Sequence, residues 1–99
     1  MRYYHKTYIK NVKSILLKGL LLEYSRYNRI YLCRFPDMDM GLGKALFAID
    51  IPDNDPELHD DGEEWEIHAY KDIPPEWINY LGNYGPNEKP NPNIGDEEK

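Results

Sequence analysis

The chain has 99 residues, which corresponds to one small domain. Hydrophobic residues make up 40% of it, enough for a small core, and nine tyrosines need hydrogen-bond partners wherever they are buried. The single cysteine, Cys33, excludes an internal disulfide and a metal site built on a cysteine pair, and it favours a reducing, cytoplasmic environment. No apolar run is long enough to cross a bilayer, so we expect no signal peptide and no membrane partner.

The formal net charge of −6 is divided unevenly along the chain. Residues 1–49 carry nine basic and three acidic residues, which gives +6, whereas residues 50–99 carry three basic and fifteen acidic residues, which gives −12. Such an asymmetry predicts two electrostatically distinct surfaces. The alternative is that the acidic half is mostly loop and tail, so that the contrast reflects disorder rather than a binding surface.

The chain begins with an aromatic-rich segment, residues 2–6, that favours a first strand. Thr7 follows and is a candidate N-cap for a helix. Apolar residues then recur at helical spacing with lysines on the other side, which predicts a helix over about residues 8–18. Gly19 is placed to end it, and Leu16 is expected in the core.

The middle of the chain alternates polar segments with short apolar ones. Residues 23–29 are polar and predict a loop, and residues 30–33 predict a short strand. Residues 38–43 favour a single helical turn. Residues 45–51 are the most apolar run and predict a central strand. Residues 52–63 are acidic and predict a mobile loop.

A second alternating segment lies at residues 64–71, where Trp65 and other apolar residues at every second position predict a half-buried strand. Trp65 is then expected in the core. Glu66 lies between the apolar positions, so its carboxylate is expected on the other face of this strand. An outward glutamate on a strand is most often only solvated, so this segment alone does not make Glu66 functional.

The end of the chain is set by two prolines and a polar tail. Pro74 and Pro75 favour an extended segment and then a helical turn, which we expect over residues 76–81. Residues 83–99 consist of Pro, Asn, Gly and charged residues and predict a disordered tail, which leaves residues 1–82 as one domain. The predicted element order favours an α+β fold with two short packed sheets and one main N-terminal helix.

Three pieces of sequence together resemble the ADP-ribosyltransferase fold, in the branch with a His–Tyr–Glu triad. The first is His5-Lys6-Thr7 before the helix, the second is Arg29-Ile30-Tyr31-Leu32, and the third is Glu66-Ile67 leading to Ile73-Pro74-Pro75-Glu76-Trp77-Ile78. The resemblance covers about residues 3–81. It implies a compact split sheet with one main N-terminal helix, NAD as cofactor, and transfer of ADP-ribose to a protein or nucleic-acid acceptor.

The resemblance also implies roles for five residues. His5 would hydrogen-bond a ribose hydroxyl of NAD, Lys6 would offer its backbone groups to the nicotinamide amide, and Thr7 would contact the ribose or cap the helix. Tyr31 would stack on the nicotinamide ring. Glu66 would accept from the ribose 2′-hydroxyl and stabilise the positive charge that develops on the sugar.

Departures from the family keep a second function class open. Lys6 stands where the family has glycine, the segment after Tyr31 is short, and the chain is about two strands shorter than well-formed members. Small members of phages and mobile elements include inhibitors of host defence. The alternative is therefore a catalytically inactive acidic binding protein that blocks a partner on the same scaffold, for example by imitating nucleic acid.

Other chemistries have weaker support in the sequence. The histidines His5, His59 and His68 match no metal-ligand spacing, so we expect no metal. Cys33 on a strand is more often a small buried apolar residue than a nucleophile. The acidic segment lacks the calcium-loop pattern.

Overall fold

The computed structural model describes most of the chain, namely residues 1–25, 28–36, 43–52, 55–60 and 64–84. Residues 38–42 of the expected helical turn and residues 85–99 of the expected tail lie outside the described residues. Among the described helices, none has both the length and the apolar character that crossing a membrane requires.

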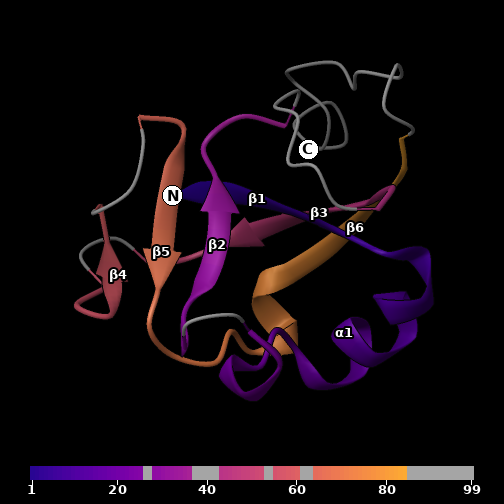
Figure 1. Cartoon of the computed structure of the whole chain (residues 1–99), viewed down its shortest axis with the longest axis horizontal. Helices are drawn as coiled ribbons and strands as arrows, with labels where there is room; N and C mark the ends of the chain where they lie inside the picture. The colour runs from indigo at the N-terminus through magenta and orange to yellow at the C-terminus, as the bar shows by residue number, and fades with distance from the viewer. Residues whose placement is uncertain (26–27, 37–42, 53–54, 61–63, 85–99) are drawn as a thin grey trace.

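The described residues form a six-stranded antiparallel sheet in the order β4-β5-β2-β1-β3-β6 (Figure 1). The strands are β1 (Arg2–Thr7), β2 (Ile30–Cys33), β3 (Ala45–Asp50), β4 (Leu58–His59), β5 (Glu66–Ala69) and β6 (Ile78–Asn83). The helical segments are η1 (Ile9–Asn11), α1 (Val12–Lys18), η2 (Leu22–Tyr24) and η4 (Pro75–Trp77). The α+β class and the single main helix are thus confirmed.

The expectation of two separate sheets packed face to face is wrong. β1 and β3 pair along six residues, from Arg2↔Asp50 to Thr7↔Ala45, while β1 and β2 meet at the single pair Tyr4↔Cys33. Figure 1 shows β2 and β5 crossing β1 and β3 at a steep angle. One hydrogen-bonded sheet is therefore bent at a narrow junction between two halves.

Each face of this sheet carries its own apolar cluster. We call the face that packs against Ile15 of α1 the helix face, and its cluster includes Tyr3, Phe47 and Ile67. We call the other face the second face, and its buried cluster is smaller: Tyr4, Cys33, Leu46 and Ala48. Because successive side chains of a strand point to opposite faces, these two clusters fix the side to which the residues of β1, β2, β3 and β5 belong.

The predicted helix is present but shorter, because η1 occupies its first turn and α1 begins at Val12. Thr7 does not cap it: Thr7 ends β1, and its hydroxyl oxygen accepts a 3.2 Å hydrogen bond from the Asn11 side chain. Gly19 ends the helix with φ 86°, and a Cβ there would lie 2.0 Å from the Ile73 carbonyl oxygen. Glycine is therefore required at this close approach.

Two expected core residues, Leu16 and Trp65, are exposed, at 44% and 41%. Ile15 is the buried residue of α1, at 7% exposure, because the tighter 3₁₀ turn before α1 rotates the helix relative to a regular α-helical register. Trp65 precedes β5, just beyond the last pair, Cys33↔Glu66, and its carbonyl accepts from the Arg34 amide at 2.9 Å.

The C-terminal expectations also need correction. The helical turn expected over residues 76–81 is only the 3₁₀ turn η4, which ends at Trp77. β6 then pairs with β3, which buries Ile78 opposite Ile49. The sheet continues past the expected domain end at residue 82, since the Tyr84 amide donates to the Lys44 carbonyl at 2.7 Å. The expected loop over residues 52–63 contains a strand, β4, along the edge of β5.

Candidate functional site

The three residues of the suspected triad lie on three neighbouring strands. His5 is on β1, Tyr31 on β2 and Glu66 on β5, and these strands are adjacent in the sheet (Figure 1). Three segments that are far apart in the sequence are therefore brought side by side.

Tyr31 and Glu66 share the second face. Glu66 pairs with Cys33, and Cys33 pairs in turn with Tyr4, a member of the second-face cluster. Tyr31 lies two positions before Cys33, so its side chain points to the same side as that of Cys33.

His5 lies on the opposite, helix face. It follows Tyr4 in β1 and pairs with Phe47, which belongs to the helix-face cluster. The structure thus brings the three strands together but does not bring the His5 ring into one cleft with Tyr31 and Glu66.

His5 is joined to Tyr31 through the backbone. The His5 Nδ1 lies 2.9 Å from the Tyr31 carbonyl oxygen, which can only accept, so Nδ1 carries the proton. Burial lowers the pKa of His5 and so favours the neutral ring, while the hydrogen bond to Tyr31 acts in the opposite direction with a smaller effect. In that tautomer the second nitrogen, Nε2, is an acceptor.

Glu66 is tied to a residue that sequence reasoning did not select. The His68 Nε2 lies 2.5 Å from the Glu66 Oε1, and the His68 ring meets the Tyr31 ring edge-on with centroids 4.7 Å apart. The Glu66 side chain is 26% exposed, whereas that of His68 is 3% exposed. The carboxylate is consequently held by a buried imidazole and remains partly open to solvent.

The pKa of the Cys33 thiol depends in part on the charge of Glu66. Burial and then the negative charge of Glu66 raise the pKa of the Cys33 thiol to about 11. A thiol with so high a pKa is a poor nucleophile at neutral pH. This agrees with its interpretation as a buried apolar residue.

Lys6 and Thr7 are divided between the two faces as well. Lys6 pairs with Leu46 of the second-face cluster, so its side chain shares the face of Tyr31 and Glu66. Thr7 pairs with Ala45, on the helix face, as does His5 two positions earlier. Lys6 thus adds a long cationic side chain to the face that Tyr31 and Glu66 share.

An arginine orders the aromatic side chains on the second face of β2 and β5. The Arg29 Nε donates to the Tyr31 hydroxyl at 3.0 Å, and a second nitrogen lies 3.4 Å from the Tyr70 hydroxyl. On the β4 side, the His59 ring meets the Tyr70 ring with centroids 4.8 Å apart. These contacts fix the orientation of Tyr31 at both its ring and its hydroxyl.

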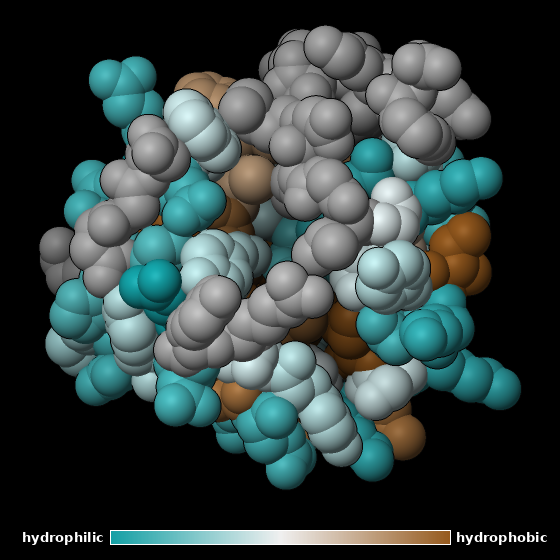
Figure 2. All heavy atoms as spheres, viewed as in Figure 1, coloured by the Kyte–Doolittle hydropathy of each residue, from teal (hydrophilic) through white to brown (hydrophobic). Residues whose placement is uncertain are grey.

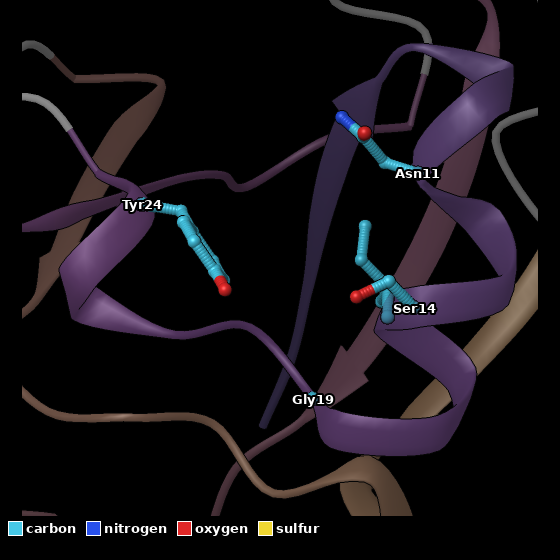
Figure 3. Close-up of a pocket in the computed structure, with 5 residues that line it drawn as sticks. Asn11, Ser14, Gly19 and Tyr24 are labelled. Atoms are coloured by element: carbon cyan, nitrogen blue, oxygen red, sulfur yellow. The ribbon is translucent and has the colours of Figure 1, made fainter.

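A small pocket lies on the helix side of the molecule, between η2 and the first helical segment. It has a volume of about 240 Å³ and is lined by Asn11, Ser14, Ile15, Gly19 and Tyr24. Figure 3 shows the Tyr24 ring on one side and the Asn11 and Ser14 side chains on the other. An aromatic ring, an amide and a hydroxyl thus surround a space smaller than the roughly 300–1,000 Å³ of a typical ligand pocket.

The pocket is connected to the end of β1, since its lining residue Asn11 donates a hydrogen bond to the Thr7 hydroxyl. Sequence reasoning missed Asn11, Ser14 and Tyr24. The available signal was Tyr24 in an otherwise polar loop, but nothing in a linear pattern shows that this loop folds back toward the helix.

Within the described ranges, no three metal-ligating side chains gather into a candidate metal site.

The acidic charge of the second half is partly compensated. Asp50 pairs with Arg2 at 2.7 Å, Asp60 pairs with Arg34 at 2.8 Å, and Asp55 pairs with Lys71. Two of these pairs, Asp50 with Arg2 and Asp60 with Arg34, link the acidic half of the chain to the basic half.

Comparisons with known proteins give no match: no family model fits the chain, and neither a curated protein nor a solved structure resembles it significantly. The functional argument therefore depends on the residues and their geometry.

Proposed function

We propose that the chain is an ADP-ribosyltransferase-like protein that binds NAD on its helix face but does not transfer ADP-ribose, and so acts as a binding protein. The observation that carries this proposal is the division of the suspected triad between two faces of the sheet. His5 lies on the helix face, and Glu66 lies on the second face.

NAD binding is supported by the groups on the helix face. A neutral His5 with its proton on Nδ1 leaves Nε2 to accept from a ribose hydroxyl. Tyr24, Asn11 and Ser14 supply a stacking surface and polar partners in the pocket. At about 240 Å³ the pocket suits one end of a dinucleotide rather than the whole molecule.

Loss of transfer is supported by the position of the carboxylate. Cleavage of the bond between ribose and nicotinamide develops positive charge on the sugar, and a fixed carboxylate must lie against that charge to stabilise it. A ribose that contacts His5 is separated from Glu66 by the sheet itself. Glu66 is also held by His68.

The proposal is tested by calorimetric titration with NAD and by measuring NAD consumption in the same samples. We expect binding without consumption. His5→Asn keeps a donor for the Tyr31 carbonyl but removes Nε2, and Tyr24→Ala removes the stacking surface. Each should weaken NAD binding by at least about tenfold, which corresponds to roughly 1.4 kcal/mol.

Glu66→Gln is the matched control and should leave NAD affinity within about twofold, since its side chain lies on the other face. Consumption of NAD by the wild type would contradict the loss of transfer. Absence of NAD binding would contradict the cofactor and leave a binding protein that does not use NAD.

A second candidate is an active ADP-ribosyltransferase with Glu66 as the catalytic carboxylate. It is favoured by the adjacency of the three strands and by the partial exposure of Glu66 beside Tyr31. In that case Glu66→Gln should lower the transfer rate by about 10²–10³. Tyr31→Ala should instead weaken NAD binding, and mass spectrometry of protein and nucleic-acid acceptors should detect the added ADP-ribose.

A further inference from the structure

Three aliphatic side chains of η1 and α1, which together form the first helical segment, are exposed and lie outside the core. Ile9 is 49% exposed, Leu16 is 44% exposed and Leu17 is 75% exposed. Leu16 and Leu17 are consecutive residues of α1, and Ile9 lies in η1, the turn that precedes α1. We call these three residues the aliphatic patch. Figure 2 shows apolar side chains beside hydrophilic ones over the α1 region of Figure 1.

Lysines lie in the same helical segment as the aliphatic patch, and Lys13 is three and four positions before Leu16 and Leu17, which makes it their neighbour on the helix surface. Lys10, Lys13 and Lys18 are all exposed, and residues 1–22 contain no aspartate or glutamate. Single exposed apolar residues are common, but neighbouring ones rimmed by one sign of charge mark an interaction surface. The surface has an apolar centre and a cationic rim, as protein interfaces have an apolar core and a polar rim.

We propose that the aliphatic patch docks an acidic, aliphatic segment of a partner protein. The rim charges require a negative partner, and the patch requires apolar side chains at its centre. In a second copy of the chain, Asp50, Asp55 and Asp60 are already paired with bases of their own chain, so these three carboxylates are poor partners for the lysines, and self-association is one outcome of the test.

An anionic bilayer is also a poorer occupant than a protein segment. The whole chain has a net charge of −6 and a largest extent of 32 Å. An extended anionic plane repels that excess charge as well as attracting the lysines, whereas a local acidic segment meets only the rim. The proposal does not depend on NAD binding, since none of the three patch residues lines the pocket.

The test uses the full chain and a fluorescent synthetic helix of leucine and glutamate, with leucine–glutamine and leucine–lysine helices as comparisons. We expect saturable binding of the glutamate helix, at least about tenfold tighter than the glutamine helix, and weaker at about 0.3 M than at 0.05 M salt. Leu16→Ser with Leu17→Ser should weaken binding at least about tenfold, and so should Lys10→Glu with Lys13→Glu.

Matched controls remove equivalent groups elsewhere on the surface. Phe35→Ser removes an apolar side chain that is 53% exposed, and Lys44→Glu reverses another exposed lysine. Both should change affinity less than about twofold, and circular dichroism should confirm that every variant is folded.

Three results would overturn the proposal. One is no saturable binding of the glutamate helix up to about 1 mM. Another is tighter binding to phosphatidylglycerol vesicles than to the helix, which would assign the patch to lipid. The last is self-association in sedimentation experiments that is lost in the Leu16→Ser, Leu17→Ser variant, which would assign it to a second copy.

Discussion

At the scale of single residues, the environment of Glu66 determines what its carboxylate can do. His68 holds one carboxylate oxygen, and Cys33 lies directly opposite on β2. The charge of Glu66 therefore acts on a buried thiol as well as on any ligand. This makes Cys33 a built-in probe of the carboxylate.

We predict that Glu66→Gln makes the Cys33 thiol more reactive. Burial and then the charge of Glu66 raise its pKa to about 11, so removing the charge lowers that pKa and increases the thiolate fraction at a given pH. The rate of alkylation by a small reagent between about pH 8 and 9 measures this. Glu64→Gln, which neutralises an exposed glutamate nearby, is the control and should leave the rate unchanged. Equal rates in both variants would mean that burial alone sets the pKa.

A second prediction concerns how His5 makes the free energy of unfolding depend on pH. Burial lowers the pKa of His5 in the folded state, so the unfolded chain binds a proton more readily. The contribution of neutral His5 to the free energy of unfolding is fully present above the pKa of histidine in the unfolded chain, about 6.5. It is lost as the pH falls below that pKa. Urea denaturation at pH 7.5 and 5.5 should show a smaller loss of stability for His5→Asn than for the wild type. His59→Asn, on exposed β4, should behave like the wild type; if both variants did, His5 would not be the group responsible.

At the scale of elements, the helix shows how one short 3₁₀ turn changes which residues are buried. Hydrophobic spacing predicted the helix correctly, but the register was wrong because η1 replaces its first turn. Ile15 faces the core and Leu16 faces outward.

We therefore predict opposite outcomes for neighbouring substitutions. Ile15→Ala should lower the free energy of unfolding by about 2–5 kcal/mol, because it leaves a cavity in the helix-face cluster. Leu16→Ala should cost less than about 1 kcal/mol, because almost half of the side chain is exposed. Urea denaturation of the two variants measures the difference, and similar losses would contradict the observed register.

Strands β1, β2 and β3 were predictable because their own alternation or apolar content identifies them. β6 was not, because Pro74, Pro75 and Glu76 favour a helical turn locally, and only the unpaired edge of β3 draws the following residues into a strand. The residues of the suspected triad were chosen from the resemblance to the ADP-ribosyltransferase fold, and their roles stay a prediction. The face of the sheet on which each of these residues lies was not predictable. It depends on the pair Tyr4↔Cys33, which is set by the tertiary register of β1 and β2.

At the scale of the whole molecule, the sheet extends to the end of the described chain. The Tyr84 amide is bonded to Lys44, and the Tyr84 side chain packs on the second-face cluster. The domain therefore includes residues 83 and 84, two positions more than the sequence indicated.

We predict that deleting residues 85–99 changes the free energy of unfolding by less than about 0.5 kcal/mol, because their composition has no apolar periodicity. Deleting residues 83–99 should cost about 1–3 kcal/mol, since it removes a backbone hydrogen bond and the packing of Tyr84. Thermal denaturation of both truncated chains measures this. A large loss for the shorter deletion would show that residues 85–99 contribute to the fold.

The strand order has a consequence for how the protein is made. β1 leaves the ribosome first, yet it lies in the interior of the sheet, between β2 and β3. The buried residues Phe47 and Ile49 of β3 gain their last neighbouring strand only when β6 has been synthesised. Until then a growing chain presents an apolar strand with an unpaired edge. Chaperones bind such edges, and the same edges promote aggregation. Nascent chains stopped before residue 78 should therefore be the form most dependent on chaperones.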